Sequence, residues 1–240
     1  TGAGVANTTG TGGITIIPLL SKGSPESENS NVDANYILGI QSGSNVIAAD
    51  FEEGTGSTSP GLNHPLVGTT VITDNVWHHA AATFANGVLR IYLDGELEGT
   101  LTLTPAVFPQ GASIQHAALG TMITSTGTAN GRFQGVLDEA RIWNIEKSGT
   151  QIQASINDQI TTPQSGLLAR WGLNEGTGTI IHANAATNVN GSITGSGYSW
   201  VNPGAPFDLV FTPPAAPTSL TATATSNSAI QLNWTDNANN

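Results

Sequence analysis

The sequence predicts an all-β fold, a two-sheet antiparallel sandwich with one short helix. Only 10% of the residues are charged, while Gly, Thr, Ser and Asn are abundant. Thr favours strands, and Asn and Gly favour turns. Short runs of alternating apolar residues recur along the chain with turn residues between them. One segment has helical spacing, with Ser148 as N-cap followed by Gln151, Ile152, Ser155 and Ile156. Many short strands with one helix favour a sandwich.

The predicted strands follow from this alternation. In chain order they are residues 36–41, 45–51, 77–84, 88–94, 97–103, 114–119 and 133–143. Asn86-Gly87 is a strong two-residue hairpin signal between the third and fourth runs. Two further strands are predicted after a Pro-rich stretch, at 220–225 and 229–234.

Composition excludes several classes of partner and chemistry. The formal net charge is −11, and nucleic acids and anionic membranes require a basic face. The absence of Cys excludes zinc ribbons, thiol nucleophiles and disulfide frameworks. No apolar run approaches the roughly 20 residues of a membrane span, so membrane insertion is not expected. Thr1 is not a natural start, and we expect a leader before it and a secreted or cell-surface protein.

Two motifs resemble one known family. Residues 76–84 (VWHHAAATF) followed by 89–95 (LRIYLDG) are similar to the central hairpin of laminin-G-like, concanavalin-A-like jelly-roll domains. Residues 133–144 (FQGVLDEARIWN), with the helix to Ile156, resemble the late strand and helix of that family. The resemblance implies a jelly-roll sandwich over roughly the first 160 residues.

The family hosts lectins, adhesion modules, pentraxin-like binders and some glycosidases, so it does not fix the function. We expect an extracellular binding or adhesion module for a glycan or protein ligand, stabilised by calcium. The alternatives are a structural spacer in a multidomain surface protein and a polysaccharide-acting enzyme.

Domain boundaries depend on a segment that follows the helix. Residues 166–178 look like the opening of a jelly-roll domain, so either a second copy begins there or the segment supplies closing strands to the first. We favour closing strands and expect a sandwich over 1–212, with 166–212 contributing these strands. A linker is expected at 213–217. Residues 218–240 resemble the truncated start of a fibronectin type III module, which makes neighbouring domains of the same chain expected partners.

The first hairpin predicts a metal site. Its register sets Ile40 opposite Ile47 and Asn35 opposite Glu52. Alternation then places four polar side chains together at the open end: Asp33, Asn35, Asp50 and Glu52. Nearby polar residues are Glu53, Asn63 and His64. Oxygen ligands without Cys or His favour calcium. The alternative is a solvated acidic rim on an edge strand.

The second hairpin predicts a ligand-binding face. Pairing Phe84 with Leu89 and Ala80 with Leu93 makes one face apolar. The opposite face then carries four side chains around the small Ala81: His79, Arg90, Tyr92 and Asp94. Sugars bind such a surface by stacking on an aromatic ring and bonding polar groups. The alternative is an outer face covered by a neighbouring loop.

Catalysis lacks a candidate in the sequence. Asp138 and Glu139 interrupt the alternation of their strand, but adjacent side chains point to opposite faces and cannot flank one bond. A bulge in which Asp138 accepts from backbone amides is favoured over an acid/base pair. We therefore expect no enzymatic activity.

Overall fold

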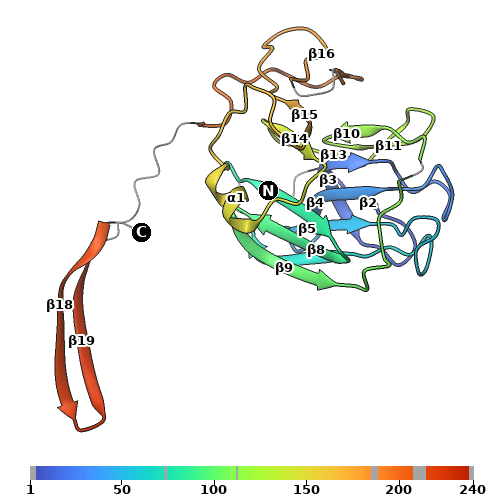
Figure 1. The fold of residues 1–240 in the computed structure, drawn as a ribbon. Coiled ribbons are helices and arrows are strands. Elements are labelled where there is room, and N and C mark those ends of the chain that lie inside the picture. The colour runs from blue at the N-terminus through green and yellow to red at the C-terminus, as the bar shows by residue number, and fades with distance from the viewer. Residues whose placement is uncertain (1–3, 73–74, 112, 185–188, 208–214, 238–240) are drawn as a thin grey trace. The chain divides into compact units, whose positions relative to one another are not determined.

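The computed structural model describes residues 4–72, 75–111, 113–184, 189–207 and 215–237. The chain forms two compact units, Thr1–Phe207 and Asp208–Asn240. The first unit is mostly β with one short helix, as predicted, and its two main sheets are antiparallel (Figure 1).

The larger sheet has the strand order β10-β3-β4-β5-β6, and β2 pairs with β3 at one end. Its strands are β2 (Asn7–Thr8), β3 (Thr15–Lys22), β4 (Tyr36–Gln41), β5 (Val46–Phe51), β6 (Leu66–Val71) and β10 (Ala117–Leu119). The smaller sheet has the order β7-β8-β9. Its strands are β7 (Ala80–Ala85), β8 (Val88–Leu93) and β9 (Glu96–Thr102).

The main core lies between these sheets. Ile17, Ile40 and Ile47 of the larger sheet pack with Ile91 and Leu93 of the smaller one. Both predicted hairpin registers are confirmed. Ile40 lies opposite Ile47 in the first hairpin, and the second pairs Phe84 with Leu89 and Ala80 with Leu93.

The opposite face of the larger sheet is buried as well. Ile16, Ile37 and Ala48 pack there against Met122, a residue of β11 (Met122–Ile123). β11 pairs with β12 (Ala129–Asn130). Polar side chains at the end of this face therefore lie in a buried environment and not on a solvated rim.

Strand β3 is the main element that the alternation did not predict. It carries Pro18, which cannot donate to a ladder and normally argues against a central strand. The structure accommodates the ring with a register shift between Pro18 and Leu20. Gly39 lies opposite Pro18, where a Cβ would come within 2.3 Å of the Ile17 carbonyl oxygen.

The prediction of one continuous strand over 133–143 is wrong for residues 134–139. The segment divides into β13 (Arg132–Phe133), which pairs with β1 (Gly4–Val5), and β14 (Ala140–Trp143). Between them Glu139 has φ of 53°, a conformation that ends a regular strand.

The helix is confirmed as α1 (Gly149–Ala154), with a capping box between Ser148 and Gln151. None of the helices in the described ranges has the length and apolarity needed to span a membrane. After the helix, β15 (Leu167–Trp171) pairs antiparallel with β14. A last small pair follows, β16 (Ile180–Ile181) with β17 (Gly191–Ser192).

The second unit is a two-stranded hairpin of β18 (Ala215–Ser226) and β19 (Ala229–Asn237). Its strands are longer than the predicted 220–225 and 229–234. The expected linker 213–217 is shortened accordingly, because β18 begins at Ala215, while 213–214 lie outside the described residues. Four large apolar side chains of the hairpin are exposed: Leu220, Ile230, Leu232 and Trp234.

Candidate functional site

Three carboxylates converge at one end of the larger sheet, on the face that packs against Met122 and is opposite the main core. One oxygen each of Glu28, Asp33 and Glu52 lies within 4.8 Å of the others. Asp33 precedes β4 and Glu52 follows β5, so the hairpin places them together. Glu28 comes from the preceding loop, which is held by a 2.8 Å hydrogen bond from the Thr11 amide to Glu28 Oε1.

Three of the six carboxylate oxygens of this acidic cluster are buried and lack partners. Asp33 and Glu52 are 0% exposed. Asp33 Oδ2, both carboxylate oxygens of Glu52 and Asn35 Oδ1 make no hydrogen bond. Asn35 lies across the hairpin from Glu52, whose amide donates to the Asn35 carbonyl at 3.2 Å. Burial, and then the neighbouring Asp33, raises the pKa of Glu52. Several uncompensated acceptors in one buried place fit a cation with hard oxygen ligands.

Asp50, the fourth predicted ligand, lies outside this acidic cluster. Its Oδ2 accepts a 2.5 Å hydrogen bond from Thr9 Oγ1, and a Cβ on Gly13 would come within 2.8 Å of that oxygen. Burial raises the pKa of Asp50 to about 7. The hairpin register places Asp50 on the expected face. Its side chain, however, bonds to Thr9 in the loop between β2 and β3 and not to the acidic cluster.

The nearby polar residues have partners of their own. His64 Nε2 lies 2.7 Å from Glu53 Oε1, and the Ser59 amide donates to Glu53 Oε2. Asn63 Nδ2 donates to the Thr11 carbonyl at 3.2 Å. Glu53, Asn63 and His64 therefore fix the loops around the acidic cluster.

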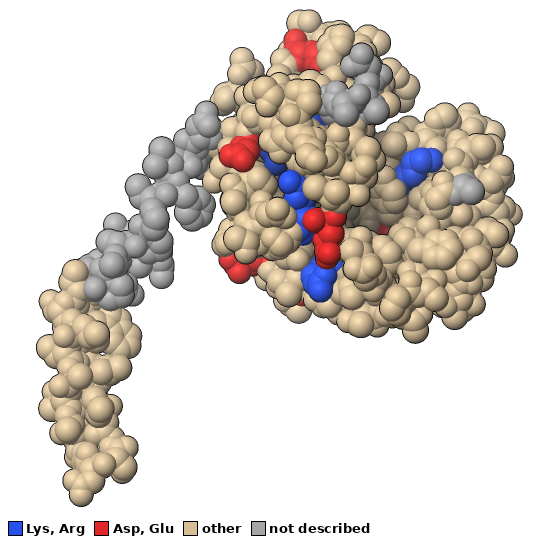
Figure 2. Space-filling view, viewed as in Figure 1, with Lys and Arg blue, Asp and Glu red and all other residues tan. Residues whose placement is uncertain are grey.

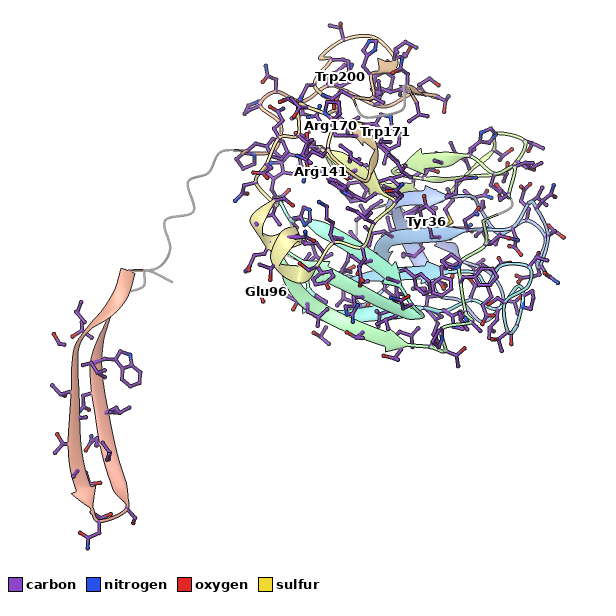
Figure 3. The ribbon with its side chains drawn as sticks, viewed as in Figure 1. Tyr36, Glu96, Arg141, Arg170, Trp171 and Trp200 are labelled. Atoms are coloured by element: carbon purple, nitrogen blue, oxygen red, sulfur yellow. The ribbon has the colours of Figure 1, made fainter. Side chains whose placement is uncertain are left out.

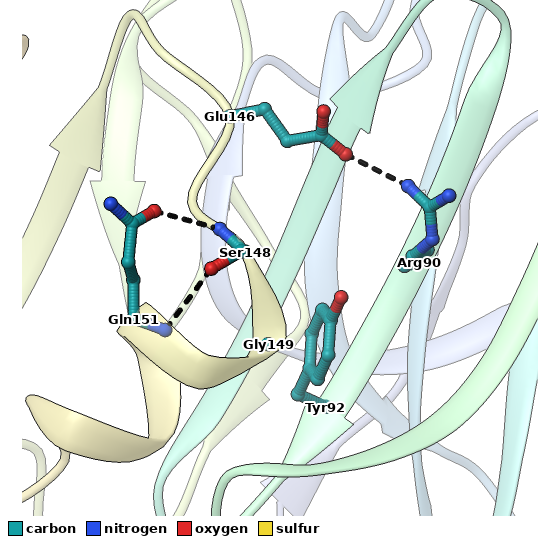
Figure 4. A pocket seen from close by; sticks show the side chains of 6 residues that line it. All are labelled: Arg90, Tyr92, Glu146, Ser148, Gly149 and Gln151. Carbon is teal, nitrogen blue, oxygen red and sulfur yellow. Dashed lines mark hydrogen bonds and ion pairs between the residues drawn. The ribbon is translucent and has the colours of Figure 1, made fainter.

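A pocket of about 370 Å³ lies where the smaller sheet meets the start of α1. Six residues line it: Arg90, Tyr92, Glu146, Ser148, Gly149 and Gln151. Arg90 Nη1 donates to Glu146 Oε1 at 2.8 Å, and the capping box fixes Ser148 and Gln151 (Figure 4). We call this the helix pocket.

Tyr92 presents its hydroxyl, and not its ring face, to the helix pocket. The residue is 5% exposed, and a Cβ on Gly149 would lie 3.2 Å from the Tyr92 Cε1 atom. Figure 4 shows the hydroxyl pointing into the space between Glu146 and Arg90. The start of α1 thus covers the ring that the sequence offered as a stacking surface.

His79 and Asp94 do not line the helix pocket with Arg90 and Tyr92. Asp94 accepts from the His79 amide at 2.8 Å and contacts His78 Nδ1 at 2.7 Å, which organises the turn before β7. His79 Nδ1 is buried without a partner. Burial, followed by the positive charge of Arg141, lowers the pKa of His79 to about 4. The imidazole is therefore neutral at physiological pH.

Asp138 and Glu139 are engaged in structural contacts. Asp138 Oδ2 accepts from the Ala205 amide at 2.8 Å. Glu139 is paired with Arg141 and Arg170. Figure 3 shows these arginines on the side of the sandwich that carries Trp171 and Trp200.

The architecture and these motifs agree with one family. A model described as the concanavalin A-like lectin/glucanases superfamily matches residues 6–153. The chain belongs to this superfamily. The matched range contains both main sheets, the acidic cluster and all six residues that line the helix pocket. No curated protein matches the chain significantly.

Two solved structures are similar to parts of the chain. One is a "putative carbohydrate binding protein" from Bacteroides ovatus ATCC 8483, with 17% identity and a TM-score of 0.49 over 79% of this chain and 50% of that one. The other is an S-layer domain-containing protein (residues 221–444) from Clostridium thermocellum ATCC 27405. It has 20% identity and a TM-score of 0.28 over 55% of this chain and 59% of that one. The chain spans half to three fifths of the structures it matches.

Proposed function

We propose that the sandwich is a secreted or cell-surface glycan-binding module whose helix pocket takes a neutral saccharide. Membership of a superfamily of lectins and glucanases supports a carbohydrate ligand. The observation that carries the proposal is the convergence of Arg90, Tyr92, Glu146, Ser148 and Gln151 on one pocket. These groups offer both donors and acceptors, as sugar hydroxyls require. Because Glu146 balances the charge of Arg90, the pocket favours an uncharged ligand.

Glycan-array binding followed by titration calorimetry tests this proposal. We expect Tyr92→Phe, which removes only the hydroxyl, to weaken binding about three- to tenfold, in line with one lost hydrogen bond. Tyr36→Phe is the matched control, since Tyr36 packs in the inner core away from the pocket. The proposal fails if no neutral glycan binds, or if the two variants lower affinity equally.

A calcium ion at the acidic cluster is the second part of the proposal. Glu28, Asp33, Glu52 and the Asn35 side-chain oxygen would hold it. The partnerless buried oxygens support this assignment, because burying carboxylates without compensation is costly. The ion would stabilise the loops by neutralising these charges.

The remaining assignments concern activity and context. We propose that the domain is not an enzyme, supported by the engagement of Asp138 with a backbone amide and of Glu139 with two arginines. We also propose that the hairpin 215–237 is the first strand pair of a fibronectin type III module. Its exposed apolar side chains support this, since a lone two-stranded hairpin is marginal in water. If no glycan or protein ligand is found, the spacer role remains.

A further inference from the structure

Arg132 is the one Lys or Arg residue in the described ranges whose side chain has no partner. The whole chain contains six Lys and Arg residues. Arg90, Arg141 and Arg170 form ion pairs. Lys22 donates to the Gln115 carbonyl, and Lys147 lies over the Trp143 ring. Figure 2 shows how sparsely basic side chains occur on the face in view. An exposed, uncompensated guanidinium is therefore exceptional in this acidic chain.

This guanidinium lines a second pocket, also of about 370 Å³. The pocket lies along the paired strands β1 and β13, and residues of the loop that follows β17 border it. Its lining comprises Gly4, Val5, Arg132, Phe133, Gln134, Ser196 and Gly197. We call it the Arg132 pocket. None of these described lining residues is acidic, and Gln134 and Ser196 add polar groups beside the apolar Val5 and Phe133.

The two pockets differ in charge. Arg90 of the helix pocket is paired with Glu146 at 2.8 Å, whereas Arg132 faces its pocket unpaired. A planar guanidinium matches a carboxylate with two parallel charge-assisted hydrogen bonds. The net charge of −11 repels an anionic ligand at the Arg132 pocket only weakly. Exposed charges more than about 8 Å away are screened at physiological ionic strength.

We infer that the Arg132 pocket binds the carboxylate of an acidic saccharide, a uronate residue of a polysaccharide. Arg132 bonds the carboxylate, Gln134 and Ser196 meet ring hydroxyls, and the apolar side chains contact the sugar's carbon skeleton. The inference rests on the proposed glycan-binding function and adds a second site of different charge preference.

Calorimetry with three trisaccharides tests this inference: trigalacturonate, its carboxyl-reduced counterpart galactotriose, and a sulfated galactotriose. Arg132→Gln should weaken trigalacturonate binding at least tenfold, while Lys147→Gln, which removes a positive charge that lines neither pocket, changes it less than twofold. Ser196→Trp, which fills the Arg132 pocket, should also remove this binding. Because Arg132 is exposed and unpaired, Arg132→Gln should leave the melting temperature unchanged.

The outcomes separate the two proposals. Trigalacturonate affinity that survives both Arg132→Gln and Ser196→Trp overturns the Arg132 pocket, whatever happens at the helix pocket. Binding of the sulfated probe alone overturns the carboxylate assignment. Failure of every neutral glycan, with trigalacturonate bound through Arg132, overturns the helix pocket and leaves the second site standing.

Discussion

Glu139 and Arg170 form a buried, bidentate ion pair that links β15 to the segment before β14. Arg170 Nε donates to Glu139 Oε1 at 2.8 Å, and Arg170 Nη2 donates to Oε2. The same carboxylate accepts from the Ile160 amide at 3.0 Å and from Arg141 Nε at 3.3 Å. The side chains of Arg170 and Glu139 are 8% and 4% exposed. These contacts hold Glu139 in its positive-φ conformation.

Breaking this pair should destabilise the domain strongly. In Glu139→Gln the buried arginines lose their counter-charge, and we expect the free energy of unfolding to fall by about 3–5 kcal/mol. Denaturant titration measures the loss. Glu146→Gln makes the same chemical change in the more exposed pair with Arg90, where about 0–1 kcal/mol is expected. Equal losses in the two variants would contradict a buried structural role for Glu139.

The segment after the helix should be part of the sandwich's cooperative unit. β15 pairs with β14, and Leu167 is 1% exposed. We expect Leu167→Ala to lower the free energy of unfolding by about 2–5 kcal/mol. Deletion of 166–202 should unfold the whole sandwich cooperatively. Calorimetric melting provides the measurement. If the shortened chain melts as the intact one does, the segment is a separate unit.

His79 should make the domain less stable in mild acid. Its pKa is lowered from 6.5 to about 4 in the folded state, so between these values the unfolded chain binds more protons. Stability due to the neutral imidazole is therefore present above pH 6.5 and is lost as the pH falls toward 4. A pKa unit corresponds to about 1.4 kcal/mol, and we expect a loss of order 2 kcal/mol between pH 7 and 4.5.

Urea titrations at these two pH values, with His79→Gln and the control His116→Gln, isolate this contribution. His79→Gln should flatten the pH dependence because the amide does not titrate. His116 is exposed, and its replacement should leave the slope unchanged. An unchanged slope in His79→Gln would show that other groups cause the acid sensitivity.

Local signals in the sequence predicted much of the fold. Asn86-Gly87 fixes the register of the second hairpin, and Ser148 with Gln151 fixes the start of α1, because each signal acts between neighbours in the chain. β3 was missed because Pro18 argues against a central strand. The sheet accommodates Pro18 through a register shift and through Gly39, which lies opposite it on β4.

The sites were predicted less completely because they depend on long-range packing. Hairpin register placed Asp33 and Glu52 together, but Glu28 joins them only through the loop contact with Thr11, for which the sequence has no periodic signal. Tyr92 was correctly placed on the outer face of its strand. That its hydroxyl rather than its ring faces the pocket follows from the approach of Gly149, which lies more than fifty residues away in the chain.

Calcium should stabilise the fold through Glu52 and not through Asp50. At a hundredfold excess over its dissociation constant, a ligand contributes about 2.7 kcal/mol, which for a domain of this size corresponds to roughly 5–10 °C in melting temperature. A chelator should lower the melting temperature by this amount in the wild-type protein. Glu52→Gln should abolish the sensitivity because it removes a charged ligand of the cluster. Asp50→Asn should retain it, since Asp50 bonds to Thr9 instead. Scanning calorimetry with and without chelator distinguishes these outcomes. A wild-type curve unaffected by chelator and by added calcium would rule out the metal site, and loss of sensitivity in Asp50→Asn alone would restore the ligand set that the sequence first suggested.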